Sequence, residues 1–511
     1  MFKQARYTTS IVIAAGSLLV TAAATAQTAP VWTVEPAAQA RVVIDPNTTI
    51  RAQLPRTLYS FNMRYNQFER ELFDAKTWQP KTPITDELLP MPGVFFRYPG
   101  GIVANHYEWE KGALSRDERI AQRTSGQSVE AYPYFGPAEY LDWMKQLQGT
   151  AWWTLNLLGA GNVSKPVELP SATMAESNRN LAQYLQANYP AQTQWLYQLG
   201  NELERNRYEW PNEKYVSRSR DTINAILSVD PNAKFVAFMR EFNIRYKYTR
   251  TGTSSASAFF KDVMTGLPMI KDFSLQMYYD GRLSPTARYI AVPEMLTRVQ
   301  QALAMAKQAR PGNYNVWITE HSKRMDLSGS TSPSPNTLDT GISAGDFLLG
   351  LAQVSEVKGA GLQGLQGGRA TFFKDTLTGT PAFWALRMLE TQPWSRVLAS
   401  RTASPNKSGY PGGYDVRAVG FVDATGTKLG VSVVNRYNQP TQLEINYAPF
   451  KGTSKTVRHY HMSGTSGVDA AMIERGFKLA TAPALTDKAF NSTGSVFVML
   501  PPSSVSTITF E

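Results

Sequence analysis

Short apolar runs of β character alternate with amphipathic helical patterns along most of this 511-residue chain. Such alternation predicts parallel strands, because each helix returns the chain to the end of the sheet where the next strand begins. Eight such units favour a closed (β/α)8 barrel over an open doubly wound sheet. No glycine-rich phosphate loop follows the first run, which argues against nucleotide binding. The predicted strands are 58–63, 94–99, 151–157, 195–200, 234–238, 273–278, 315–320 and 361–366.

Helical spacing of apolar residues fills most of the intervals between these runs. The predicted helix at 341–357 is the most apolar of these segments. The other predicted helices cover 137–148, 171–187, 213–227 and 293–309.

Strand patterns dominate from about residue 396 onward. The runs 416–423 and 428–436 flank Ala-Thr-Gly-Thr, as in a β-hairpin. We predict a C-terminal antiparallel β-sandwich, completed by strands that precede the barrel. The predicted organisation is a signal peptide (1–26), N-terminal strands that join the sandwich (27–55), a catalytic barrel (56–392) and a β-sandwich (393–511).

The first residues have the pattern of a secretory leader. Lys3 and Arg6 precede an apolar run at 10–24, and Ala24-Thr25-Ala26 has the form of a cleavage site. A run of roughly 15 residues is shorter than the about 20 needed to span a bilayer. Export to the periplasm or the extracellular space is therefore expected, with a retained N-terminal anchor as the alternative.

Composition narrows the chemistry further. The chain has no cysteine and only four histidines, so neither a thiol nucleophile nor a metal site is expected. Its formal charge of +11 falls to +9 when the leader removes Lys3 and Arg6. A basic exported protein suits acidic polysaccharide or anionic envelope surfaces, with general solubility as the plain alternative. Nucleic acid is not an expected partner, because no basic run or nucleic-acid motif is present.

Two carboxylates stand at the ends of predicted barrel strands. Glu202 follows the fourth strand in Gly200-Asn201-Glu202, and Glu320 ends the seventh. Barrel enzymes carry their reactive groups at the carboxyl ends of strands, so both side chains are expected at the barrel mouth. Retaining glycoside hydrolysis needs such a pair, one acid to protonate the leaving oxygen and one carboxylate to attack the anomeric carbon.

Several segments resemble those of clan A glycoside hydrolases, and most of all family 51, the α-L-arabinofuranosidases. The resemblance rests on FRYPGGIVANHYEWEKG (96–112), LGNELE (199–204), SLQMYY (274–279), WITEH (317–321), the helix at 341–361 and LGVSVVNR (429–436). It extends over nearly the whole chain after the leader. It implies a barrel with a β-sandwich, a double-displacement mechanism, no cofactor, and a polysaccharide or oligosaccharide substrate.

The resemblance also assigns roles. Glu202 falls on the acid/base, Glu320 on the nucleophile and Asn201 on the companion of the acid/base. Arg97 falls on the support of the nucleophile, and Tyr278 on its tyrosine neighbour.

Three positions depart from the family pattern, and all lie around the sugar. Ile102 replaces an asparagine that contacts the sugar, and Gln276 stands where the family has histidine. The first strand ends in Ser-Phe-Asn-Met-Arg, which brings Asn62 or Arg64 to a position usually held by glutamate. These changes predict an altered sugar pocket, and a base at Arg64 favours an acidic sugar.

Two further residues are candidate substrate contacts. His321 follows the predicted nucleophile and can hydrogen-bond it, with a structural role as the alternative. Trp109 lies in a predicted mouth loop and can stack on a sugar ring, with packing as the alternative. The eighth strand offers Gln363 or Gln366 as pocket lining.

The function predicted from the sequence is a retaining glycoside hydrolase, arabinofuranosidase-like but with an altered pocket. One alternative is a carbohydrate-binding protein on a catalytically idle barrel. Another is a clan A glycosidase acting on a pyranoside or an acidic glycan. The sequence leaves the sugar, its linkage and the oligomeric state open.

Overall fold

The computed structural model divides the chain into two units, Met1–Pro30 and Val31–Glu511. It describes residues 30–189, 195–204, 208–239, 256–282, 288–324, 337–365, 371–372, 377–447, 456–464, 480–485 (backbone only) and 494–510. The predicted leader lies outside the described residues.

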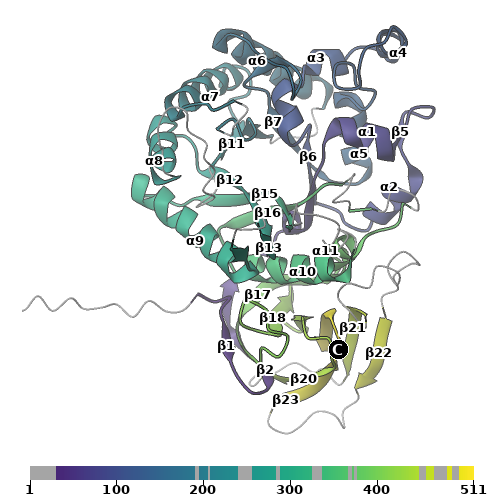
Figure 1. Ribbon diagram of the computed structural model, residues 1–511, viewed down its shortest axis with the longest axis vertical. Coiled ribbons are helices and arrows are strands. Elements are labelled where there is room, and N and C mark those ends of the chain that lie inside the picture. Colours follow the sequence, from purple (N-terminus) through teal and green to yellow (C-terminus); the bar gives the residue numbers. More distant parts are fainter. Residues whose placement is uncertain are drawn as a thin grey trace, which may run out of the picture. The chain divides into compact units, whose positions relative to one another are not determined.

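The core of the second unit is a closed barrel of eight parallel strands (Figure 1). Neighbouring barrel strands follow one another in the order β10-β11-β12-β15-β16-β3-β6-β7, and all pairs are parallel. The predicted barrel is confirmed. The strands are β3 (Ser60–Asn62), β6 (Phe95–Tyr98), β7 (Thr150–Leu155), β10 (Leu196–Leu199), β11 (Lys234–Phe238), β12 (Asp272–Tyr279), β15 (Asn315–Lys323) and β16 (Val357–Gln363).

Helices surround the barrel in Figure 1. They are η1 (Arg56–Tyr59), α1 (Tyr65–Leu72), α2 (Thr82–Leu88), η2 (Ile102–His106), α3 (Trp109–Gly112), α4 (Arg116–Thr124), α5 (Pro137–Gln146), α6 (Ser171–Asn188), α7 (Asn212–Leu227), α8 (Ala256–Gly266), α9 (Val292–Ala309), α10 (Leu338–Ala352) and α11 (Pro381–Glu390). No helix in the part of the chain that the structure describes has both the length and the apolarity to cross a bilayer.

Helix α10 and strand β16 begin a few residues earlier in the sequence than the predicted helix at 341–357 and strand at 361–366. The helix ends at Ala352, and the eighth strand begins at Val357, where the apolar pattern had suggested continued helix. Two glycines on β16 weaken its strand signal. A Cβ on Gly359 would lie 2.8 Å from the rings of Phe95 and Trp317, so large aromatics in the barrel require a small residue here.

The barrel interior has an apolar floor below a polar layer. Phe95, Trp152, Val236 and Trp317 form a separate buried cluster, and the rings of Trp152 and Trp317 meet edge to face with centroids 5.0 Å apart. Because inward-facing residues alternate along a strand, the residue two positions after Phe95, Arg97, faces inward above this floor. A packed floor leaves only the carboxyl ends of the strands for chemistry.

The C-terminal strands form one curled, mainly antiparallel sheet, in the order β22-β21-β24-β19-β18-β17-β2-β20-β23. As predicted, N-terminal strands complete it: β2 pairs with β17 and β20, and β1 pairs with β17. The strands are β1 (Val34–Pro36), β2 (Ala40–Arg51), β17 (Trp394–Ser404), β18 (Val416–Asp423), β19 (Leu429–Asn435), β20 (Thr441–Asn446), β21 (Val457–Ser463), β22 (Ala480–Leu485), β23 (Ser495–Leu500) and β24 (Ser504–Phe510). Three two-stranded pairs lie elsewhere: β4 (Phe73–Asp74) with β5 (Gln79–Pro80), β8 (Gly159–Gly161) with β9 (Pro166–Glu168), and β13 (Gly281–Arg282) with β14 (Tyr289–Ile290).

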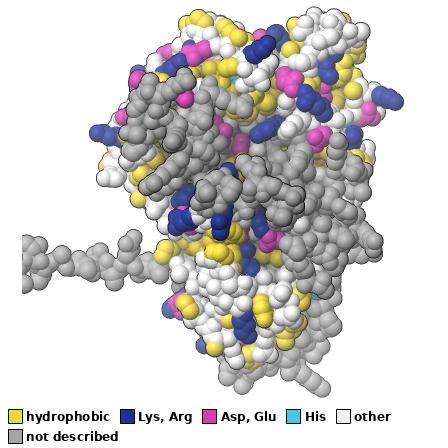
Figure 2. All heavy atoms as spheres, in the orientation of Figure 1, with side chains coloured by type: hydrophobic (Ala, Val, Ile, Leu, Met, Phe, Trp, Pro, Cys, Tyr) yellow, Lys and Arg dark blue, Asp and Glu magenta, His cyan; other side chains and the backbone are white. Residues whose placement is uncertain are grey.

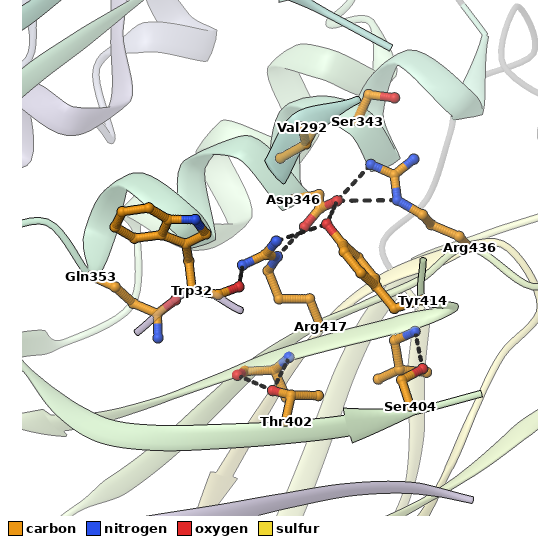
Figure 3. Close-up of polar contacts among 12 residues, drawn as sticks. Trp32, Val292, Ser343, Asp346, Gln353, Thr402, Ser404, Tyr414, Arg417 and Arg436 are labelled. Carbon is orange, nitrogen blue, oxygen red and sulfur yellow. Dashed lines mark hydrogen bonds and ion pairs between the residues drawn. The ribbon is translucent and has the colours of Figure 1, made fainter. Parts of the chain in front are cut away.

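Buried charges join this sheet to helix α10 of the barrel (Figure 3). Asp346 on α10 pairs with Arg417 of β18 and with Arg436, which follows β19, and it accepts a 2.7 Å hydrogen bond from Tyr414. Burial alone would raise the pKa of Asp346, but the two guanidinium groups outweigh it and hold that pKa below its usual value. Arg436 also pairs with Asp280, at 2.9 Å, so two carboxylates face two guanidinium groups.

Candidate active site

Arg97 is the centre of a buried polar cluster at the barrel mouth. Its Nη1 donates to Glu320 Oε1 and to Asn62 Oδ1, both at 2.9 Å. Its Nε donates to Gln198 Oε1 at 2.8 Å, and its Nη2 donates to Asn201 Oδ1 at 2.5 Å. The guanidinium is fully buried, and burial lowers the pKa of Arg97 below its usual value. The negative charge of Glu320 acts in the opposite direction but is the smaller effect. One cation therefore orients four side chains, which come from β3, β10, β15 and the turn after β10.

A β-bulge turns Glu320 into the barrel. Leu275 of β12 pairs with Ile318 of β15, but the next residue, Gln276, pairs with Glu320, so Thr319 is an extra residue. Without this bulge, strict alternation from the inward Trp317 would direct Glu320 outward. The bulge brings its carboxylate to Arg97.

The second oxygen of Glu320 also has a donor. Tyr278 Oη donates to Glu320 Oε2 at 2.7 Å. Glu320 is 3% exposed, so its carboxylate is fixed by one donor on each oxygen in a nearly dry environment.

The same bulge turns His321 outward, away from this cluster. Its Nδ1 lies 3.0 Å from Tyr279 Oη, and its ring contacts Phe347 of α10 at a centroid distance of 5.4 Å. Full burial lowers the pKa of His321 to about 3. The structure therefore does not bring His321 to the predicted substrate side, and its contacts are those of a packing residue.

Asn201 and Glu202 occupy a sharp turn after β10. Gly200 and Glu202 have φ values of 70° and 51°, and such a left-handed conformation is uncommon outside glycine. Asn105 of η2 holds the turn, since its side chain donates to Asn201 O at 2.6 Å and accepts from Asn201 N at 3.0 Å. Glu202 is half-buried, and its charge acts on Arg97. Both predicted catalytic carboxylates thus act electrostatically on one guanidinium, and Glu320 also contacts it directly.

Gln276 belongs to the cluster as well. Its amide donates to Asn201 Oδ1 at 2.9 Å, so Asn201 Oδ1 accepts from both Gln276 and Arg97. Gln363 accepts a short hydrogen bond from Asn62 on the neighbouring strand, whereas Gln366 lies outside the described residues.

Arg64 lies at the start of α1, beside the turn that follows β6. A Cβ on Gly101 would lie 2.9 Å from Arg64 Nε, and a Cβ on Gly100 only 1.6 Å from Met63 O, so both glycines are needed for this close approach. Arg64 is half-buried, and its Nε has no hydrogen-bond partner among the described residues. Ile102, the departure beside these glycines, begins η2.

The structure places Trp109 away from this cluster. Its indole donates to Ser177 O and Oγ, and its ring packs against Tyr184 of α6 at 5.3 Å. These contacts support the packing alternative rather than a sugar contact.

Sequence reasoning missed several members of the site. Gln198 faces inward two residues after the inward Leu196, and this spacing was the available signal. Asn105 lies in η2, away from any strand end, and Arg324 directly follows β15 but lies four residues after the predicted end of that strand at 320. The Arg324 guanidinium lies over the Tyr278 ring at 6.0 Å.

Comparisons with known proteins locate the fold. No protein-family model matches the chain, and no curated protein matches it by sequence. The structure is similar to the GH51 α-L-arabinofuranosidase from Thermotoga petrophila RKU-1, with a TM-score of 0.71 and 16% identity over 93% of this chain and 100% of that one. The GH51 arabinofuranosidase from Xanthomonas axonopodis pv. citri gives a TM-score of 0.68 at 16% identity, again over 93% and 100%.

A second family is similar to a lesser degree. A xyloglucanase of glycoside hydrolase family 44 from Paenibacillus polymyxa gives a TM-score of 0.60 at 12% identity, over 92% of this chain and 99% of that one. The chain has the fold of these GH51 enzymes, a barrel with a C-terminal β-sandwich. At these identities the likeness establishes the fold, and the activity has to be argued from the site.

Proposed function

We propose that this protein is a retaining glycoside hydrolase in which Glu320 is the nucleophile and Glu202 the acid/base. The observation that carries the proposal is the fixation of Glu320 by Arg97 and Tyr278, at a strand end that shares Arg97 with Glu202. The GH51-like fold supports it, since those enzymes act on glycosides.

The proposed reaction has two displacements. A Glu320 oxygen attacks the anomeric carbon while the Glu202 carboxylic acid protonates the departing glycosidic oxygen, giving a glycosyl ester on Glu320. A water molecule then attacks the same carbon, Glu202 takes its proton, and the Glu320 carboxylate leaves. Arg97 and Tyr278 stabilise the charge that returns to Glu320, and Asn201 is available to the sugar hydroxyl beside the anomeric carbon.

Within this function we infer a substrate that carries a carboxylate near the cleaved bond. Arg64 and Arg324 support this, because both lie just beyond barrel strands, both have a buried Nε with no partner among the described residues, and no ion pair to either is seen there. Described Lys and Arg side chains on the face shown in Figure 2 are interspersed with Asp and Glu, so the assignment rests on these two arginines and not on a basic patch.

A panel of aryl glycosides and polysaccharides tests both the hydrolase mechanism and the acidic substrate. Each neutral sugar in the panel is paired with its uronic acid counterpart. We expect hydrolysis by the wild type, little by Glu320→Ala, and near wild-type rates for Glu356→Ala, whose carboxylate pairs with Lys307. The first product should keep the substrate's anomeric configuration by NMR. Inversion, or activity retained by Glu320→Ala, would contradict the mechanism.

The same screen separates the substrate classes. Arg64→Ala should lower kcat/KM for the acidic substrate and leave that for its neutral counterpart unchanged. Equal losses on both would remove the acidic assignment but keep the hydrolase. Glycan binding without any cleavage would favour the carbohydrate-binding alternative. Export remains part of the proposal, and N-terminal sequencing of the mature protein tests it, with Gln27 as the expected first residue.

A further inference from the structure

Asp280 directly follows β12, two residues after Tyr278, and every contact on its carboxylate comes from another element. It is 2% exposed and adopts φ 51°, a conformation that a non-glycine residue keeps only when its surroundings enforce it. Tyr410 Oη donates to Oδ1 at 2.6 Å, and Ser343 Oγ of α10 donates to Oδ2 at 2.7 Å. The backbone N–H of Val292, at the start of α9, donates to Oδ1 at 3.2 Å.

The C-terminal sheet supplies the strongest of these contacts. Arg436 Nη2 lies 2.9 Å from Asp280 Oδ2, and its guanidinium lies 3.8 Å from the centre of the Tyr410 ring. Arg436 is itself held by Asp346, as Figure 3 shows. The C-terminal part of the chain therefore supplies two of the contacts that hold Asp280, beside those from α9 and α10.

The backbone beside Asp280 leads directly to the candidate nucleophile. Tyr279 O accepts a 2.6 Å hydrogen bond from Arg324 N, and Tyr278 donates to Glu320. The hydrogen bonds on the Asp280 carboxylate and on Tyr279 O hold the end of β12 in place. A shift of Asp280 would therefore also move Tyr278, which lies two residues before it.

We propose that Asp280, held by Arg436 and Tyr410 from loops of the C-terminal sheet, is a positioning residue that keeps the Tyr278 hydroxyl on Glu320. The proposal rests on the proposed hydrolase function. It gives the sheet a part in the reaction: the sheet fixes one of the two donors to the nucleophile.

The chain offers a matched pair of variants. Tyr410→Phe removes the hydroxyl that holds Asp280, and Tyr414→Phe removes a hydroxyl that donates to Asp346 at 2.7 Å. Both rings are buried, and both lose one hydrogen bond to a buried carboxylate, so their losses in thermal stability should be similar. We expect Tyr410→Phe to lower kcat about 3- to 10-fold with little change in KM, and Tyr414→Phe to leave both near wild type.

A spectroscopic measurement decides the proposal without catalysis. In protein labelled with ¹³C at the tyrosine Cζ, the Tyr278 signal is assigned by its loss in Tyr278→Phe. We expect that signal to move in Tyr410→Phe and in Asp280→Asn, and to stay in place in Tyr414→Phe. If Tyr410→Phe moves neither kcat nor the signal further than Tyr414→Phe does, Asp280 is not a positioning residue. If the wild type cleaves no glycoside, the hydrolase proposal fails, while the signal still reports on Asp280.

Discussion

The barrel mouth and the contact between α10 and the C-terminal sheet both bury arginine against carboxylate and tyrosine, yet their charges are arranged differently. At the contact, Arg417 and Arg436 face Asp346 and Asp280, so two cations are matched by two anions. At the mouth, the ion pair of Arg97 within the described part of the chain is with Glu320, and its other partners there are neutral amides. A cluster with equal numbers of cations and anions is suited to joining two parts of a fold. A cluster whose anion lies at the carboxyl end of a barrel strand is suited to catalysis.

Replacing Glu320 should separate the two regions most strongly. Glu320→Gln keeps the shape of the side chain and removes the nucleophile, so kcat should fall roughly 1000-fold or more. The variant should still fold, because three amide oxygens continue to accept hydrogen bonds from Arg97 after its ion pair is lost. Kinetics on the best aryl glycoside and a melting curve measure both, and a parallel collapse of stability would show that the mouth cluster is structural.

The converse is expected for Asp346→Asn. It leaves a buried cation uncompensated, which costs about 3–5 kcal/mol of folding free energy, while kcat at low temperature stays within a factor of a few. The pKa of Asp346 is lowered in the folded protein, so its contribution is present above the ordinary value of 3.8 and is lost as pH falls through the folded pKa. Denaturant unfolding at several pH values tests this, and a wild-type acid limb in the variant would refute it.

Tyr278→Phe is predicted to lower kcat less than Glu320→Gln does. It removes one of the two donors to Glu320, and a hydrogen bond to a charged group is worth roughly 10- to 100-fold in kcat. Unchanged kinetics would mean that Arg97 alone positions the carboxylate.

His321 is buried between the barrel and α10, and its lowered pKa predicts how stability depends on pH. Its pKa falls from 6.5 to about 3 on folding, so the unfolded chain takes up a proton first as pH drops below 6.5. The free energy of unfolding should therefore fall by about 1.4 kcal/mol per pH unit between these values. His321→Gln should remove this slope but keep that of His459, whose pKa is lowered to about 4. Unfolding curves from pH 7 to pH 4 decide it.

Trp109→Phe should have the smallest effect. It removes the hydrogen bonds to Ser177 and keeps an aromatic ring against Tyr184, so stability should fall by about 1 kcal/mol. Both kcat and KM should stay within about twofold of wild type, because the indole lies away from the Arg97 cluster. A clear rise in KM for a long oligosaccharide, but not for an aryl glycoside, would restore Trp109 as a sugar contact.

Much of the architecture could be predicted because it depends on repeated local patterns. The eight strands and the hairpin of β18 and β19 follow from hydrophobic periodicity, and the strand ends indicated where Arg97, Asn201 and Tyr278 would meet. The direction of His321 could not be predicted, because the bulge at Thr319 breaks the alternation on which such a prediction depends. The partners of Asp280 could not be predicted either, since Tyr410 and Arg436 are 130 and 156 residues away along the chain.

The residues beside the bulge also favour the native strand pairing of β15. If β15 slipped by one residue against β12 in one direction, Glu320 would take the place of His321 against Phe347. In the other direction, His321 would take the place of Glu320, and Arg97 would face an imidazole instead of its anion. Both changes cost electrostatic free energy, so the residues that the reaction needs also reject the misregistered barrel during folding.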